Sequence, residues 1–567
     1  MRNGSARDIP CSTLSETNND MKRIKSLALA LSAVLSVSAV YAETTVKVQE
    51  TRIPILIERY DNVLFRLKIS ADEGGRLDRV ALQLGPECDA SHIHSLKLYY
   101  GGTESRTRDH RGVFEPAEYI ASNDPGNTLK ANPAFSILKC EVRNPGRTVT
   151  FNPGMTLFPG VNYLWVSVRM KNKAKLSDKI SAAITSVRID GVEAAVEKVS
   201  PDGIVHRMGV GVRHAGDDGS KAFRIPGLVT SNAGTLVAVY DIRYESSRDL
   251  QGHIDIGVSR SRDGGRTWEK MRRAISYGEY GGLPAAQNGA GDPAILVDNV
   301  TGDLIIASIW AHGMGNGLSW WSTVPGISPD YTAQLVLSRS SDDGKTWSAP
   351  VSVTPQLKDS SWAFFFQGPG RGITTSDGTL VFATQYTEFD AGRTPHAGIM
   401  YSKDHGKTWN MHKAAKDSTT EAQVAELPDG SLMLNMRDNR GGARSVAVTR
   451  DLGRTWEEHP SSRKALIEPV CMASLISVRA EDNVTGKDLL LFSNPESTRS
   501  RNRMTIKASL DGGLTWSPEH SVLLDEGTGW GYSCLSMIDG ETVGILYESS
   551  VAHMTFQAIP LKDIIKE

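Results

Sequence analysis

The part of the chain after residue 205 carries arginine, carboxylate and tyrosine side chains in short, distinctive stretches. Arginine stays protonated, and its planar fork of donors matches the two oxygens of a carboxylate. Aspartate and glutamate can give or take protons, and a tyrosine beside a base can act as a nucleophile. The stretches are Phe223-Arg224-Ile225-Pro226, Arg243 to Asp249, Gly291-Asp292-Pro293, Glu421 to Leu427, Asn435-Met436-Arg437, Arg499 to Arg503 and Gly531-Tyr532-Ser533. Side chains of these types could hold an anion and move protons around it.

Other common kinds of site are not indicated. The five cysteines are scattered, without the Cys-x-x-Cys or histidine spacing of a zinc site. The stretch Gly368-Pro369-Gly370-Arg371-Gly372 lacks the Lys-Ser/Thr ending of a phosphate-binding loop, which argues against nucleotide binding. A net charge of −2 over 567 residues gives no argument for nucleic acid or for an anionic membrane. We therefore expect no metal, no cofactor and no nucleic acid partner.

One eight-residue pattern, Ser/Thr-x-Asp-x-Gly-x-Thr-Trp, occurs five times, each time after a β-rich run. The aspartate can hydrogen-bond nearby backbone and the glycine supplies a positive φ, so the centre of the pattern is turn chemistry. The tryptophan can bury a large face as the chain leaves the turn. These five copies, called boxes below, span 261–268, 340–347, 402–409, 449–456 and 509–516. Each box predicts a braced β-hairpin.

The spacing of the boxes predicts the architecture of residues 205–567. The box aspartates, from Asp263 to Asp511, lie about 62 residues apart on average, which is enough for four strands and their loops. The region has room for six such units, one of which lacks a clear box. We expect an all-β fold in which this region forms a six-bladed β-propeller, because radial closure leaves no long open sheet edge.

Residues 43–200 carry no box and alternate short β-type runs with turns, which is typical of a β-sandwich. No carboxylate pair or metal spacing stands out, so a structural or docking module is favoured over a carbohydrate-binding one. Cys88 and Cys140 could form a disulfide or remain free, whereas Cys471 and Cys534 are better explained as buried thiols.

Residues 1–42 have the features of a leader. A basic start at Met21 to Lys25 precedes an apolar run at Leu27 to Val40, and Val40-Tyr41-Ala42 is a small-x-small cleavage site. The pattern predicts a secretory signal peptide that begins at Met21 and is cleaved after Ala42, rather than a retained membrane span. The mature protein is therefore expected in the periplasm, at the cell surface or outside the cell.

The boxes, preceded by Phe223-Arg224-Ile225-Pro226, resemble the Asp-boxes and the Phe-Arg-Ile-Pro sequence of the sialidase (neuraminidase) family. The resemblance covers the whole of residues 205–567. It implies a six-bladed propeller that removes terminal sialic acid from glycans, which would be the protein's binding partners. It also implies that the boxes are structural braces remote from the substrate.

The resemblance assigns three arginines to the carboxylate of sialic acid. Arg224 matches the first of them and Arg437 the second. The third belongs before the last box, where we prefer Arg501 and keep Arg503 and Arg499 as alternatives.

The resemblance also assigns the residues that react. A carboxylate nucleophile would be repelled by the substrate's own carboxylate, whereas a neutral phenol would not. With a pKa of about 10, a phenol needs a base to become a good nucleophile. The family's pattern makes Tyr532 the nucleophile, Glu421 its base and Asp249 the acid and base that serves the leaving group and then water. Arg243 and Asp292 match the pair near the sugar's 4-hydroxyl.

Aromatic residues between the first and third boxes are candidates for the pocket that takes the N-acetyl group or for the leaving-group side. Packing in the core explains each of them equally well. They are Trp310, Trp320, Trp321, Trp362 and Phe364 to Phe366.

The sequence thus predicts an exported exo-α-sialidase that retains configuration through a covalent tyrosyl intermediate. Two alternatives stay open. A trans-sialidase, including the intramolecular kind that releases an anhydro sugar, would share every catalytic residue. A propeller lectin without catalysis would bind the same sugar and not cleave it.

Overall fold

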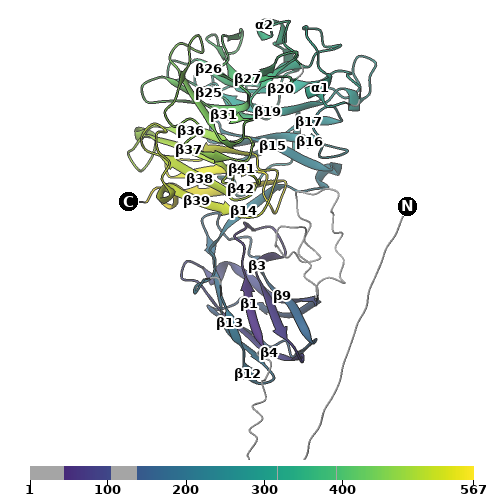
Figure 1. Ribbon diagram of the computed structural model, residues 1–567, viewed down its shortest axis with the longest axis vertical. Coiled ribbons are helices and arrows are strands. Elements are labelled where there is room, and N and C mark those ends of the chain that lie inside the picture. The colour runs from purple at the N-terminus through teal and green to yellow at the C-terminus, as the bar shows by residue number, and fades with distance from the viewer. Residues whose placement is uncertain (1–43, 104–136, 199, 316, 391, 567) are drawn as a thin grey trace, which may run out of the picture. The chain divides into compact units, whose positions relative to one another are not determined.

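The computed structural model describes residues 44–103, 137–198, 200–315, 317–390 and 392–566, and most of its regular secondary structure is β-strand (Figure 1). The predicted all-β class is confirmed. The predicted leader lies outside the described residues. Where the chain is described, no helix is both long and apolar enough to cross a membrane.

The region before residue 200 contains two antiparallel-rich sheets around one apolar core, as expected for a sandwich. Period-two burial along the strands, such as the alternation in β1, directs one face of each sheet to the core. The first sheet has the order β13 (Ala195–Glu197), β1 (Thr45–Gln49), β3 (Asn62–Ala71), β9 (Gly160–Met170), β5 (Ile93–Gly102) and β6 (Ile137–Arg143). The second has β12 (Val192–Glu193), β11 (Ala182–Ile189), β4 (Gly75–Leu84) and β7 (Thr148–Phe151), with β8 (Met155–Leu157) paired to β4.

Cys88 and Cys140 are both free thiols in this region, so the disulfide alternative does not hold. Cys471 and Cys534 are buried free thiols, as expected.

The rest of the chain forms six successive antiparallel sheets of four main strands. Middle strands such as Leu236–Arg243, Ile254–Ser261 and Leu380–Thr387 are almost wholly buried, so both of their faces are covered. The first three sheets are β15 (Ala222–Thr230), β16 (Leu236–Arg243), β17 (Ile254–Ser261) and β18 (Arg272–Ile275); β19 (Ala290–Val297), β20 (Leu304–Trp310), β21 (Gln334–Ser340) and β22 (Val351–Ser352); and β23 (Phe364–Gln367), β26 (Leu380–Thr387), β27 (Pro395–Ser402) and β28 (Asn410–Met411).

The last three sheets continue the pattern. They are β30 (Thr419–Glu426), β31 (Leu432–Asp438), β33 (Ser445–Thr449) and β34 (Glu457–Glu458); β36 (Ser474–Val478), β37 (Leu489–Pro495), β38 (Met504–Ser509) and β39 (Ser521–Asp525); and β40 (Ser533–Met537), β41 (Thr542–Tyr547), β42 (Met554–Pro560) and β14 (His206–Arg213). Short additional strands are β2 (Ile55–Leu56), β10 (Lys179–Ile180), β24 (Gly370–Arg371), β25 (Ile373–Thr374), β29 (Lys416–Asp417), β32 (Gly442–Ala443) and β35 (Ile467–Glu468). The α-helices of the described residues are single turns: α1 (Ser319–Ser322), α2 (Thr354–Leu357) and α3 (Leu561–Ile564).

The sheets contact one another in a closed cycle. The leading strand β15 contacts β19 of the second sheet and also β40 of the sixth. Contacts of β20 with β23, β26 with β30, β30 with β36 and β36 with β40 complete the cycle. In the sixth sheet, β14 precedes the first sheet in sequence and pairs with β42 near the C-terminus, so the two ends of this region are joined by backbone hydrogen bonds.

Every box lies between the third and fourth strands of a sheet, and all five have the same hydrogen bonds. In the third sheet, Asp404 accepts from Ser402 Oγ at 2.7 Å, from the backbone N–H of Thr408 at 2.9 Å and from Thr408 Oγ1 at 2.6 Å. Trp409 follows and is 2% exposed. The sixth sheet takes its fourth strand from β14, so it has no turn at which a box could lie. This explains why there are five boxes and six sheets.

Candidate active site

The leading strands and the loops beside them bring the predicted site residues together from five of the six sheets. A cavity of about 290 Å³ is lined by Asp249, Asp292, Glu421, Arg437 and Tyr532, together with apolar residues described below. Arg224, Arg243 and Arg501 contact members of this group. The eight residues span more than half of the chain, and strand register rather than sequence proximity places them.

Tyr532, Glu421 and Arg437 form one hydrogen-bonded cluster. The phenol of Tyr532 donates to Oε1 of Glu421, and Arg437 Nη1 donates to Glu421 Oε2 at 2.6 Å and to Tyr532 Oη at 3.1 Å. Burial raises the pKa of Tyr532 well above its usual value, and the charge of Glu421 raises it further, while Arg437 and Arg501 act in the opposite direction. The phenol is therefore neutral at rest, with a carboxylate already placed to accept its proton.

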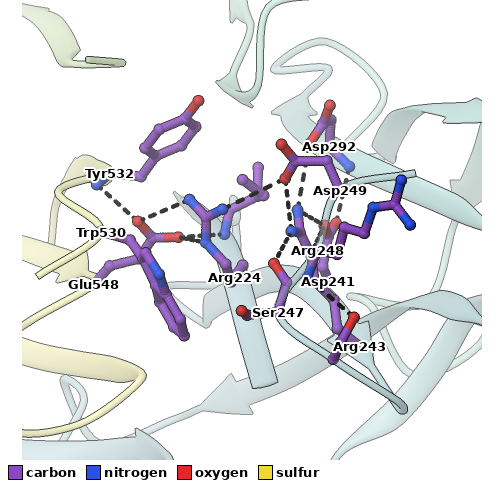
Figure 2. Close-up of polar contacts among 12 residues, drawn as sticks. Arg224, Asp241, Arg243, Ser247, Arg248, Asp249, Asp292, Trp530, Tyr532 and Glu548 are labelled. Atoms are coloured by element: carbon purple, nitrogen blue, oxygen red, sulfur yellow. Dashed lines mark hydrogen bonds and ion pairs between the residues drawn. The ribbon is translucent and has the colours of Figure 1, made fainter. Parts of the chain in front are cut away.

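Arg224 is held by Glu548, a residue to which the sequence pattern gave no role (Figure 2). Arg224 Nε donates to Glu548 Oε1 at 3.0 Å and Nη2 to Oε2 at 3.4 Å. The same carboxylate accepts from the backbone N–H groups of Ile225 and Tyr532, both at 3.0 Å. Glu548 thus fixes the arginine and the tyrosine backbone relative to each other. It directly follows an apolar strand, and only its contacts in the folded chain reveal its importance.

Asp249 lies in the loop after β16, and its side chain is 69% exposed. Its Oδ1 accepts from Arg243 Nη1 at 2.7 Å and from Arg224 Nη1 at 3.5 Å (Figure 2). Desolvation in the cavity would raise the pKa of Asp249, but the charges of Arg243 and Arg224 outweigh it and leave the pKa below its ordinary value. Without a ligand, Asp249 is a carboxylate.

Asp292 lines the same cavity as Asp249, but its pKa is shifted in the opposite direction. Burial raises its pKa well above the ordinary value, and the negative charges of Asp241 and Asp249 raise it further. Asp241 is buried beneath the corner, where it accepts from Arg243 at 2.8 Å and 3.0 Å and from the N–H of Asp292 at 2.8 Å. Burial raises the pKa of Asp241 to about 6, although Arg243 opposes the shift. Asp241 is a second residue that the sequence analysis did not find.

Of the three candidate arginines before the last box, Arg501 is the one that contacts the cluster. Its guanidinium lies 5.7 Å from the Tyr532 ring centre and donates to the carbonyls of Trp530 at 3.0 Å and Val470 at 3.1 Å. Arg503 instead pairs with Glu496 at 3.5 Å, and its side chain is 44% exposed. The geometry favours Arg501 as the third arginine.

Some of the aromatic candidates line the apolar side of the cavity, and the others pack elsewhere. Trp320, Trp321, Phe364 and Phe366 line it, together with Leu250 and Leu318. The others pack elsewhere: Trp310 stacks on Tyr277, Trp362 stacks on Tyr386, and Phe365 is buried between the second and third sheets.

The six sheets, the boxes and a buried tyrosine–glutamate pair beside three arginines are features of a glycosidase of the kind that uses tyrosine in place of a second carboxylate. Residues 43–193 match the N-terminal domain of BNR-repeat neuraminidase, and residues 234–545 match the BNR repeat-like domain. The chain belongs to the sialidase family.

Individual sialidases are similar to this chain over half of its length or more. A sialidase of Bacteroides fragilis (strain YCH46) is 62% identical over 546 residues, which cover 96% of this chain and 100% of that protein. The solved structure of the Hadza microbial sialidase Hz136 superposes with a TM-score of 0.86 at 55% identity, covering 92% of this chain and 100% of the other. A sialidase of Micromonospora viridifaciens is 33% identical over 340 residues, covering 59% of this chain and 50% of that protein.

Proposed function

We propose that this protein is a retaining exo-α-sialidase that hydrolyses terminal α-linked sialic acid from glycoproteins, glycolipids and oligosaccharides. The observation that carries the proposal is the contact between the Tyr532 phenol and the Glu421 carboxylate in a cavity flanked by arginines. The six sheets are the blades of the predicted propeller, and residues 43–200 form an accessory domain before it. The leader exports the protein, so its glycan substrates are met in the periplasm or outside the cell.

The three arginines hold the substrate's carboxylate. Arg224 is oriented by Glu548, Arg437 by Glu421 and Arg501 by two backbone carbonyls. These partners fix the three guanidinium groups, so the arginine donors are pre-organised for a bidentate anion.

Binding of that carboxylate prepares Asp249 to act as an acid. The charge of Arg224, together with those of Arg243 and Arg437, keeps the pKa of Asp249 low. A bound carboxylate neutralises part of that charge and adds a negative charge of its own, and both effects raise the pKa of Asp249. Asp249 can then take up a proton and give it to the departing oxygen.

Tyr532 attacks the anomeric carbon as Glu421 removes its proton, which gives a sialyl-tyrosine intermediate. Asp249, now a carboxylate again, takes a proton from water, and this water displaces Tyr532 from the sugar. Two displacements at one carbon retain its configuration. The apolar wall of Trp320, Phe364 and Phe366 suits the methyl of the N-acetyl group.

The test is proton NMR of the first product released from α2,3- and α2,6-sialyllactose. Free sialic acid that appears first as the α-anomer supports retaining hydrolysis. A 2,7-anhydro sugar, or transfer to added lactose, would overturn hydrolysis in favour of trans-sialidase activity. Binding of sialyllactose without any release would identify a lectin.

A further inference from the structure

Among the described residues, one buried arginine beside the cavity has no part in the proposed chemistry. Arg393 lies between β26 and β27 and is 7% exposed. No carboxylate lies within ion-pairing distance of its guanidinium in the described part of the chain, and burial alone lowers its pKa. Its φ is 46°, in the left-handed region that residues other than glycine rarely adopt. A buried guanidinium without a carboxylate partner, on strained backbone, costs free energy, which points to a specific role.

The guanidinium reaches across to the second sheet and binds the end of helix α1. Arg393 Nη1 donates to the carbonyl of Thr323 at 2.6 Å, and Nη2 donates to the carbonyl of Trp321 at 2.8 Å. The two donors therefore hold the last turn of α1 as a fork. The guanidinium carbon lies 6.0 Å from the ring centre of Trp321 and 5.5 Å from that of Phe389. Both rings can therefore make cation–π contacts with Arg393.

Helix α1 is a wall of the cavity. Ser319, Trp320 and Trp321 all line it, and Trp320 packs edge-on against Phe364 and Phe366 with centroid distances of 6.0 Å and 6.5 Å. A four-residue helix has almost no stability of its own, because nucleation is unfavourable and few hydrogen bonds repay it. Its position must therefore be set by contacts at its two ends.

The start of α1 is tied to the loop that carries Asp249. The backbone N–H of Ser319 donates to the carbonyl of Leu250 at 2.7 Å, and the N–H of Gln251 donates to the carbonyl of Gly317 at 3.3 Å. Arg393 supplies the attachment at the other end. Residues of the first and third sheets thus hold between them a helix inserted from the second.

We propose that Arg393 is a positioning residue for substrate recognition: it fixes helix α1, and through it the Trp320 wall of the cavity. The proposal rests on the proposed sialidase function and adds to it how the pocket for the apolar part of sialic acid keeps its shape. Arg393 itself does not touch the reacting atoms.

Arg393→Lys is the informative variant, because lysine keeps the charge but cannot donate to both carbonyls as a fork. We expect faster hydrogen exchange at the amides of Ser322, Thr323 and Val324, which are hydrogen-bonded within or just after α1. With α2,3-sialyllactose we expect KM to rise roughly tenfold, while kcat stays within about twofold because Tyr532 and Glu421 are untouched.

Arg339→Lys is the matched control. Arg339 also bridges two sheets, donating to Asp303 at 2.7 Å and to the carbonyl of His405, but it lies on the side of the boxes. It should leave KM and the exchange of 322–324 as in the wild type. A general loss of stability would lower the active fraction, and hence kcat, in both variants.

A double-mutant cycle with Trp320→Leu tests the route of the effect. If Arg393 acts through the wall, Arg393→Lys adds little to the KM of Trp320→Leu. Additive effects, or wild-type exchange at 322–324 in Arg393→Lys, would overturn the proposal. The exchange measurement does not depend on turnover. If the wild-type protein releases no sialic acid, the proposed function is wrong, but hydrogen exchange still tests whether Arg393 fixes helix α1.

Discussion

Aspartates occur in two contrasting settings in this molecule, the boxes and the cavity. Each box aspartate meets hydroxyl and amide donors, and these donors outweigh desolvation and lower the pKa of Asp342, Asp404 and Asp451 to about 2. In the cavity corner, burial raises the pKa of Asp241 to about 6 and that of Asp292 well above its usual value. A carboxylate satisfied by donors is a permanent anion and a brace, whereas one surrounded by other charges can respond to a ligand.

Substitutions in the cavity should therefore remove activity and leave stability unchanged, whereas substitutions in a box should lower stability and leave activity unchanged. The largest effect is expected for Tyr532→Phe, which deletes only the reacting oxygen. We expect kcat for an aryl sialoside to fall about 10³-fold or more, because nucleophile and base act as a unit. Thermal unfolding should be nearly unchanged and sialic acid should still bind, as measured by calorimetry. Wild-type turnover would remove Tyr532 from its role.

Glu548→Gln should cost less than loss of the nucleophile. The amide keeps the shape but loses the charge that orients Arg224. It also keeps only one of the two oxygens that accept from Arg224, Ile225 and Tyr532. We expect kcat/KM to fall about 10²-fold, as for a misplaced catalytic group. Steady-state kinetics on α2,3-sialyllactose measures this. Glu496→Gln is the control: it also changes a carboxylate that directly follows a strand, but this carboxylate pairs with Arg503 outside the cavity.

Asp249→Asn separates proton donation from binding. We expect kcat/KM for sialyllactose, whose leaving group needs a proton, to fall between about 10²- and 10⁴-fold. An aryl sialoside with an acidic leaving group should lose much less in the first displacement, which a burst of released phenol reports. Equal losses on both substrates would mean that Asp249 acts through Arg243 and Arg224 rather than as the acid.

Asp404→Ala tests the other side of the comparison. It removes three hydrogen bonds of a box, and we expect the free energy of unfolding to fall by about 1–3 kcal/mol. The kcat/KM of the folded protein should not change, because the box lies outside the cavity lining. A denaturant series with an activity assay below the transition checks both. Selective loss of activity would contradict the division of labour.

The smallest effect concerns acid stability. The folded-state pKa of Asp404 is about 2, below the unfolded value of about 3.9, so its contribution is present above pH 4 and is lost as the pH falls towards 2. Asp404→Asn should therefore reduce the slope of unfolding free energy against pH between pH 4 and 2. Near pH 7 the slope should be the same as in the wild type. An unaltered slope between pH 4 and 2 would show that the box carboxylate is not specifically stabilised.

Repetition made the fold predictable from the sequence. The boxes located five hairpins, and their spacing indicated six units. The sixth unit could be counted but not described, because its missing box follows from β14 joining β42, which no local pattern reveals.

The site was less predictable wherever residues act through distant partners. Arg224, Tyr532 and Glu421 stand in recognisable stretches, but Arg501 differs from Arg503 only in which groups it meets after folding. Glu548, Asp241 and Arg393 look like ordinary charges in the sequence. Their roles depend on burial and on partners up to 324 residues away.

The closure of the sixth sheet has a consequence for synthesis. Tyr532 immediately precedes β40 and Glu548 follows β41, so both belong to the sheet that joins β14 to the last strands. Contacts of such high sequence separation form late and slowly. A nascent chain that has made the first five sheets holds Glu421, Arg224 and Asp249 but lacks Tyr532, which we propose as the nucleophile. We therefore expect hydrolytic competence only once the sixth sheet has formed, and a chain that ends before Tyr532 should be inactive however well its earlier sheets have folded.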